Sequence, residues 1–105
     1  MFPLIEASNY DQQVLSSKGV VLINFWANWC DECQQMSLLM EEISHFLHKG
    51  DTILQVDWDK EKQLAQKAEV IGVPTLLFYF KGNEISRYFG IISKDELLNQ
   101  INKLR

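Results

Sequence analysis

One segment fixes the architecture that we expect for this chain: Val20-Val21-Leu22-Ile23-Asn24-Phe25-Trp26-Ala27. It is rich in β-branched and aromatic residues, and Asn24 is its one polar residue. A strand with one wet face alternates between apolar and polar residues, whereas a continuous apolar run is typical of a strand covered on both faces. The segment therefore predicts a central strand between two layers.

Helical and strand patterns alternate on both sides of this strand. Apolar residues at three- and four-residue steps predict a helix from Asp31 to a stop at Gly50, and a second helix that is capped by Asp59. Apolar runs predict strands over 53–58, 75–80 and 84–89, and the last two are joined by a turn at 81–83.

The two ends of the chain carry helix caps. Ser8 is expected to cap a short helix that ends near Ser16-Ser17-Lys18-Gly19, and Ser93 is expected to form a capping box with Glu96 at the start of a final helix. Strand–helix–strand alternation favours parallel strands, and the late hairpin adds antiparallel ones. We therefore expect a single α/β domain over residues 1–105, with a central mixed β-sheet flanked by helices on both faces.

Composition narrows the class of protein. The chain has 105 residues, 10 Lys and Arg against 14 Asp and Glu, and a net charge of −4 without a basic run. This balance argues against a nucleic-acid or anionic-membrane binder. No apolar run reaches the roughly 18–20 residues of a membrane helix, and the opening residues do not resemble a signal peptide. We expect a cytoplasmic protein that binds neither membrane nor nucleic acid.

Cys30 and Cys33 lie where the central strand ends and the next helix begins. Unpaired N–H groups and the helix dipole at a helix N-terminus favour a thiolate. The spacing of three residues places both sulfurs on one helix face, close enough to bridge. The first thiolate can then attack a disulfide, and the second cysteine can resolve the mixed disulfide.

Two other interpretations of the pair remain open. Cys30 and Cys33 with His45 and His48 superficially suggest a zinc site, but Cys33 and His45 are expected about 18 Å apart along one helix. Only a metal shared between two chains would escape that objection, so we expect no metal site. The cysteines could also be structural and buried, although the polar Asp31-Glu32 between them indicates a surface location.

The segment Gly72-Val73-Pro74-Thr75 precedes the third strand. A proline is tolerated as the first residue of a strand for purely structural reasons. The functional interpretation is a cis Val73–Pro74 bond whose backbone faces the cysteine pair.

Together these residues carry a resemblance to a known family. Phe25-Trp26-Ala27-Asn28-Trp29-Cys30-x-x-Cys33, Gly72-Val73-Pro74-Thr75, Lys81-Gly82 and Phe89-Gly90 resemble thioredoxins over nearly the whole chain. The resemblance implies a thioredoxin fold and thiol–disulfide exchange, with Cys30 as the exposed nucleophile and Cys33 as the buried resolving cysteine. It implies a cis-proline at Pro74 and a substrate groove, whose residues are Trp29, Val73, Pro74, Gly90 and Ile91.

Several residues depart from the family pattern and are expected to tune the redox chemistry. Asp31-Glu32 replaces the usual Gly-Pro, and two carboxylates near a thiolate should raise the Cys30 pKa, although acids in a first helical turn also stabilise the helix. Asn24 replaces a buried Asp and cannot act as a base. Gln55 replaces the Lys that is usually paired with that Asp, so the two amides are expected to hydrogen-bond.

The expected activity is reduction of protein disulfides. The cysteine pair carries the electrons itself, so no cofactor is implied, and an electron donor such as a thioredoxin reductase would regenerate the dithiol of a monomeric protein. One alternative is a thioredoxin-fold protein-binding module with little redox turnover. Another is an oxidase or isomerase, which requires a destabilised disulfide and is disfavoured by Asp31-Glu32.

Overall fold

The central strand organises a four-stranded sheet. The computed structural model describes residues 9–104. Its elements follow in the order α1 (Tyr10–Leu15), β1 (Val20–Trp26), α2 (Asp31–Ser44), β2 (Thr52–Asp57), α3 (Lys62–Lys67), β3 (Thr75–Phe80), β4 (Asn83–Phe89) and α4 (Lys94–Lys103). The strands lie in the order β2-β1-β3-β4, so β1 is an inner strand with neighbours on both sides.

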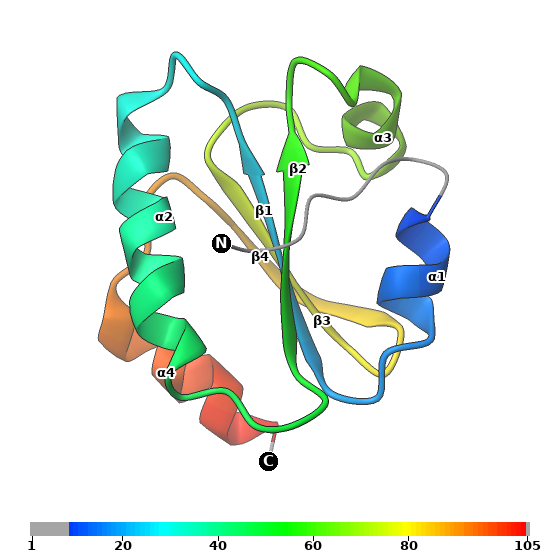
Figure 1. Cartoon of the computed structure of the whole chain (residues 1–105), viewed down its shortest axis with the longest axis vertical. Helices are drawn as coiled ribbons and strands as arrows, with labels where there is room; N and C mark the ends of the chain where they lie inside the picture. Colours follow the sequence, from blue (N-terminus) through cyan, green and yellow to red (C-terminus); the bar gives the residue numbers. More distant parts are fainter. Residues whose placement is uncertain (1–8, 105) are drawn as a thin grey trace.

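Helices cover both faces of the sheet, α1 and α3 on one and α2 and α4 on the other (Figure 1). Alternate residues of β1 enter the two cores: Val21, Ile23 and Phe25 pack toward α1 and α3, and Val20 and Leu22 pack toward α2 and α4. The first six residues of β1 are buried. The prediction of a strand between two layers is confirmed.

The direction of β3 differs from the simplest expectation. β1 and β2 are parallel, but β3 is antiparallel to β1 and β4 is antiparallel to β3. The reason lies in α3, which has six residues and therefore a length of about 9 Å, against about 20 Å for a six-residue strand. Such a short helix does not return the chain to the opposite end of the sheet, so β3 starts near the end where β2 stops.

Two expected helix boundaries need correction, and a third lies outside the described residues. Helix α2 ends at Ser44 and not near Gly50, because the N–H of Phe46 turns back to the carbonyl of Ile43 at 2.9 Å. Asp59 is not the cap of α3, whose N-cap is Glu61. Ser8 and the opening residues lie outside the described residues, and Asn9 precedes α1 without a side-chain capping bond.

The Ser93 cap and a tight turn after β3 are confirmed. The hydroxyl of Ser93 accepts a hydrogen bond from the N–H of Glu96 at 3.2 Å and caps α4. The β3–β4 loop consists of Lys81 and Gly82, both with positive φ (52° and 81°), which is the conformation of a two-residue hairpin turn.

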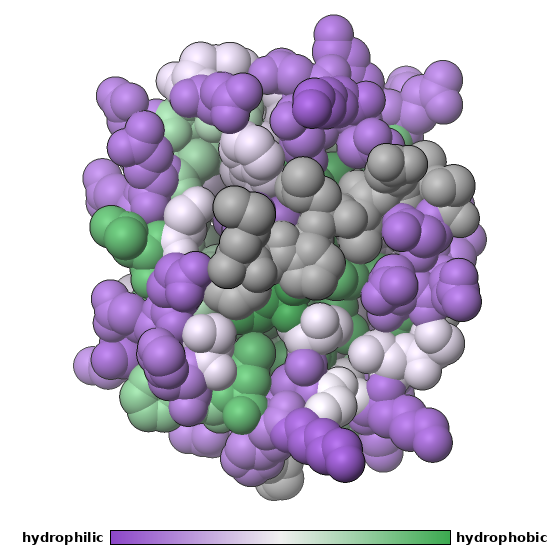
Figure 2. All heavy atoms as spheres, viewed as in Figure 1, coloured by the Kyte–Doolittle hydropathy of each residue, from purple (hydrophilic) through white to green (hydrophobic). Residues whose placement is uncertain are grey.

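Hydrophilic side chains cover most of the outer helix surfaces in the space-filling view, and apolar patches interrupt them along α2 (Figure 2). In the part of the chain that the structure describes, no helix has the length and apolar character needed to cross a membrane.

Candidate active site

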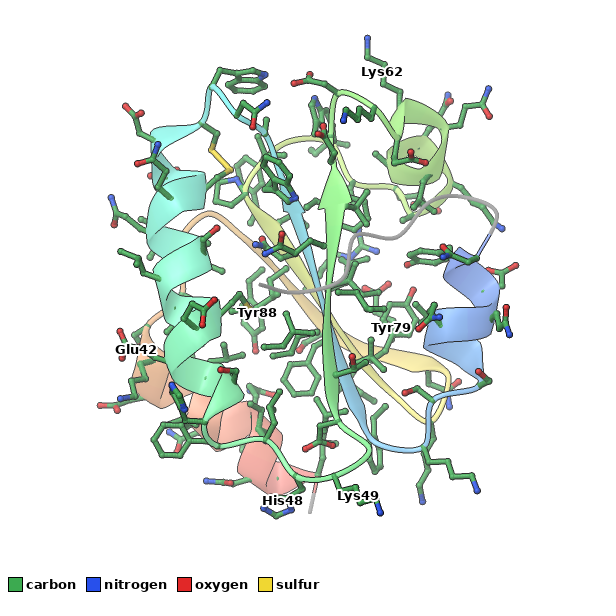
Figure 3. The ribbon with its side chains drawn as sticks, in the orientation of Figure 1. Glu42, His48, Lys49, Lys62, Tyr79 and Tyr88 are labelled. Atoms are coloured by element: carbon green, nitrogen blue, oxygen red, sulfur yellow. A yellow bond between two sulfur atoms is a disulfide. The ribbon has the colours of Figure 1, made fainter. Side chains whose placement is uncertain are left out.

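The cysteine pair lies at the N-terminal end of α2, directly after the carboxyl end of β1. Cys30 is the N-cap residue and Cys33 is in the first helical turn, with a Cα–Cα distance of 5.2 Å. The two residues form a disulfide, drawn in yellow beside the start of α2 (Figure 3). The strand–helix junction thus brings the two sulfurs together as predicted.

A backbone donor is aimed at the first sulfur. The N–H of Cys33 donates to Sγ of Cys30 at 3.2 Å, inside a helix end whose dipole also favours negative charge. Asp31 and Glu32 are exposed in the same turn. In the reduced protein, the N–H would stabilise a Cys30 thiolate, the attacking species in disulfide exchange.

The two cysteine residues differ less in exposure than expected. Cys30 is 8% exposed and Cys33 is 3% exposed, so the resemblance overstated the exposure of Cys30 in the disulfide form. Both cysteines pack in a small cluster with Ala27, against which the half-buried Trp26, Trp58 and Val73 lie. Apolar walls on one side therefore limit the approach of water to the disulfide.

A small hollow gives Cys33 a second, more polar surrounding. It has a volume of about 180 Å³ and is lined by Trp26, Ala27, Asn28, Cys33, Gln34 and Ser37. Such a volume accommodates several water molecules, each of which occupies about 30 Å³ in the liquid.

The loop before β3 lies against the cysteine cluster. The Val73–Pro74 bond is cis, and Val73 packs against the two cysteines and their neighbours. The N–H of Gly90 donates to the carbonyl of Pro74 at 2.9 Å, which joins this loop to the end of β4. Packing therefore joins Val73 to Cys30, and a hydrogen bond joins Pro74 to Gly90. These contacts bring together four of the residues predicted for the groove and the cysteine pair.

Trp29 and Ile91 are at the surface, with exposed fractions of 65% and 50%. The indole N–H of Trp29 donates to Oδ2 of Asp59 at 3.0 Å. Asp59 therefore accepts a hydrogen bond from the indole and is not the helix cap predicted from the sequence. A signal for this contact was present, because Trp29 and Asp59 follow two parallel strands whose carboxyl ends meet at one edge of the sheet.

Asn24 does not behave as expected. It is fully buried, but neither its Oδ1 nor its Nδ2 has a hydrogen-bond partner among the described residues. Gln55 is its register partner on β2 and is half-buried, so the predicted amide–amide bond is wrong. Residues directly opposite each other on paired strands lie on the same face of the sheet. That placement alone does not bring their side-chain amides within hydrogen-bond distance.

The two histidines are distant from the cysteines along α2. His45 is the C-cap residue and His48 lies in the loop that follows, both exposed, whereas Cys33 is in the first helical turn. Within residues 9–104, no three His, Cys, Asp or Glu side chains gather as a metal site.

Comparison with known proteins agrees with this geometry. The Thioredoxin family model matches residues 2–103. The chain is 34% identical to "Thioredoxin" of Chlamydia pneumoniae over 103 residues (98% of each chain), and 32% identical to "Thioredoxin" of Staphylococcus haemolyticus over 96 residues (91% and 90%). The structure of a mutant thioredoxin from Halobacterium salinarum superimposes with a TM-score of 0.83 at 26% identity, covering 96% of this chain and 88% of that one. With a Cys-x-x-Cys disulfide on a thioredoxin fold, the chain belongs to the thioredoxin family and is a thiol–disulfide oxidoreductase.

Proposed function

We propose that this protein works as a reductant of protein disulfides, with Cys30 as the nucleophile and Cys33 as the resolving cysteine. The observation that carries the assignment is the hydrogen bond from the N–H of Cys33 to Sγ of Cys30. Only Cys30 has its sulfur at the N-cap position, where the helix favours negative charge.

The proposed reaction has two exchange steps. The Cys30 thiolate attacks one sulfur of the substrate disulfide, forms a mixed disulfide and releases the other substrate sulfur as a thiolate. The Cys33 thiolate then attacks Sγ of Cys30 and releases the second substrate sulfur. The substrate gains two electrons, and the protein ends as the Cys30–Cys33 disulfide. A separate dithiol donor, such as a thioredoxin reductase, returns it to the dithiol form.

Substrate binding is assigned to the groove formed by Trp29, Val73, Pro74, Gly90 and Ile91. The packing of Val73 against the cysteines and its place just before β3 support pairing of an extended substrate segment with the Val73 backbone. The hydrogen bond from Trp29 to Asp59 holds one edge of this surface.

Cys33 must lose its proton before the second step, and Asn24 cannot accept it. The hollow beside Cys33 supports a solvent route, because Asn28, Gln34 and Ser37 give it polar walls. Four residues are proposed to tune the reaction through the electrostatic field at the two sulfur atoms and not through proton transfer: Asn24, Gln55, Asp31 and Glu32.

We further assign the protein to the cytoplasm as a single-domain monomer. A reductant needs a compartment that keeps its dithiol reduced, which the cytosol provides.

Insulin reduction with dithiothreitol as the donor tests the function. The wild type should accelerate precipitation of the insulin B chain, and Cys30→Ser should not. Equal rates for the two proteins would overturn the proposal.

Cys33→Ser separates the enzyme from a binding module. The variant should accumulate mixed disulfides with many proteins, since the second step is removed. Recovery of a single non-covalent partner and no mixed disulfides would favour the module.

A further inference from the structure

Two of the most exposed apolar side chains adjoin the exchange groove. Ile71 is 92% exposed and Phe89 is 71% exposed. Ile71 is two residues before Val73, and Phe89 directly precedes Gly90, whose N–H is bonded to Pro74. The surface that they form is therefore next to the groove residues Val73 and Gly90.

A hollow separates these two side chains. It has a volume of about 340 Å³, and its lining includes Val70, Ile71, Thr75, Tyr88 and Phe89. This volume is at the lower end of the roughly 300–1,000 Å³ of ligand pockets. It has the size and apolar character to take one large side chain.

Phe89 is held in place on one side of the hollow. A Cβ built on Gly72 would lie 2.8 Å from Cε1 of Phe89, so the ring rests on the glycine backbone. The glycine permits this close approach, and any side chain at position 72 would displace the ring.

Glu69 and Arg87 are the charged side chains that line the hollow, and Arg87 is already paired with a carboxylate. Arg87 donates to both carboxylate oxygens of Glu84 at 2.7 and 2.8 Å, and to the carbonyls of Ala68 and Glu69 at 3.0 and 2.9 Å. Its hydrogen bond with Glu84, together with the nearby charges of Glu84 and Glu69, raises the pKa of Arg87. The Arg87 guanidinium is therefore engaged by the Glu84 carboxylate and by two backbone carbonyls, whereas the Glu69 carboxylate, which borders the hollow, has no hydrogen bond or ion pair among the described residues.

Glu69 occupies this position in an unfavourable conformation. Its φ is 58°, in the left-handed region where helix ends usually place glycine. The N–H of Val70 bonds the carbonyl of Ala65 at 2.8 Å, and the N–H of Glu69 bonds that of Gln66 at 3.1 Å, which together close the end of α3. A strained non-glycine residue beside a binding surface points to a role for its side chain.

We propose that the hollow between Ile71 and Phe89 binds a large apolar side chain of the disulfide-bearing substrate, and that Glu69 pairs with a neighbouring Lys or Arg of that substrate. The proposal rests on the proposed function, because the hollow adjoins the groove in which exchange takes place. It names the substrate class: proteins with an apolar–basic pair near the reactive cysteine.

Peptides with one cysteine in a mixed disulfide with a chromogenic thiol provide the test. A Phe-Lys pair is moved along a Gly/Ser peptide one residue at a time, and the rate of thiol release by reduced protein is measured. One position of the pair should accelerate release about tenfold over the plain peptide, the effect expected for burial of an aromatic side chain. Equal rates at every position would overturn the proposal.

Variants locate the effect. Ile71→Ser and Phe89→Ser should abolish the acceleration, whereas Ile85→Ser, on the same strand as Phe89 but outside the lining of the hollow, should retain it. Glu69→Gln should lower the preference for Phe-Lys over Phe-Glu about two- to fivefold, the range of an exposed ion pair. If Ile85→Ser lost as much of the acceleration as Ile71→Ser and Phe89→Ser, the assignment of the hollow would be refuted.

Glu69→Gly separates the effect of residue 69 on stability from its effect on substrate preference. It should raise the midpoint of thermal unfolding by about 4–8 °C, because glycine tolerates the left-handed conformation, and should still lose the preference for Phe-Lys. A variant that gains stability and keeps the preference would show that Glu69 does not bind substrate.

Two outcomes separate this proposal from others. The plain Gly/Ser peptide should be reduced equally by wild type and by the hollow variants, and not by Cys30→Ser; if wild type fails on it, the proposed function fails and not the hollow. Sedimentation of the wild type as a dimer that Ile71→Ser dissociates would instead assign the surface to a second copy of the chain and overturn the proposal.

Discussion

Replacing Asn24 by aspartate should make the stability of the protein depend on pH. Asn24 is fully buried in β1, and neither polar atom of its amide has a partner among the described residues. An aspartate there would gain no compensating hydrogen bond from the surrounding residues in this arrangement. Burial of this degree raises a carboxyl pKa from about 3.9 to about 7.

The sign of the effect follows from proton binding. Below about pH 4 the introduced carboxyl is protonated in both states, and the variant resembles the wild type. Between about pH 4 and pH 7 the unfolded state binds fewer protons than the folded state, so the unfolding free energy falls as pH rises. The loss levels off above about pH 7 at about 4 kcal/mol, since each pKa unit corresponds to about 1.4 kcal/mol.

Urea unfolding of Asn24→Asp and wild type at several pH values measures this difference. Gln55→Glu is the matched control, because it makes the same amide-to-carboxylate change at the half-buried register partner and should show a much smaller pH dependence. If the difference in unfolding free energy between wild type and Asn24→Asp did not change with pH, the reasoning would be refuted. In the reduced protein, the added negative charge should also move the Cys30 thiol titration to higher pH.

Three further perturbations test other parts of the structure. Ser93→Ala should lower the unfolding free energy by about 1 kcal/mol in urea titrations, because it removes the hydrogen bond to the N–H of Glu96, while insulin reduction stays unchanged. The hydrogen bond from Arg87 lowers the Glu84 pKa, so this pair should stabilise the fold at neutral pH and lose that contribution as pH falls through the lowered pKa; Glu84→Gln should remove this part of the acid dependence of the melting temperature. Asp59→Ala should change the fluorescence of Trp29 and lower the rate of insulin reduction while the melting temperature shifts little, because the bond that it removes is exposed; an unaltered rate would show that Asp59 does not position Trp29 for substrate.

Local patterns in the sequence were sufficient for most of the elements and for the cysteine pair. The continuous apolar run of β1 is buried between two layers, and the Cys-x-x-Cys spacing at its end places both sulfurs on the first turn of α2. The Ser93 cap is likewise present. These features depend on residues a few positions apart, whose geometry is set by the backbone of a single helix or strand.

Contacts between distant segments were decided by the tertiary structure. The antiparallel direction of β3 results from the short α3, and the bond between Trp29 and Asp59 joins residues 30 positions apart. Packing between segments also decided that the buried amide of Asn24 has no hydrogen-bond partner among the described residues, and that Glu69 lies beside the Ile71–Phe89 hollow. Periodicity fixes which face a residue lies on, but hydrogen bonds and hollows depend on ångström-scale distances between segments, and those are set only when the layers pack.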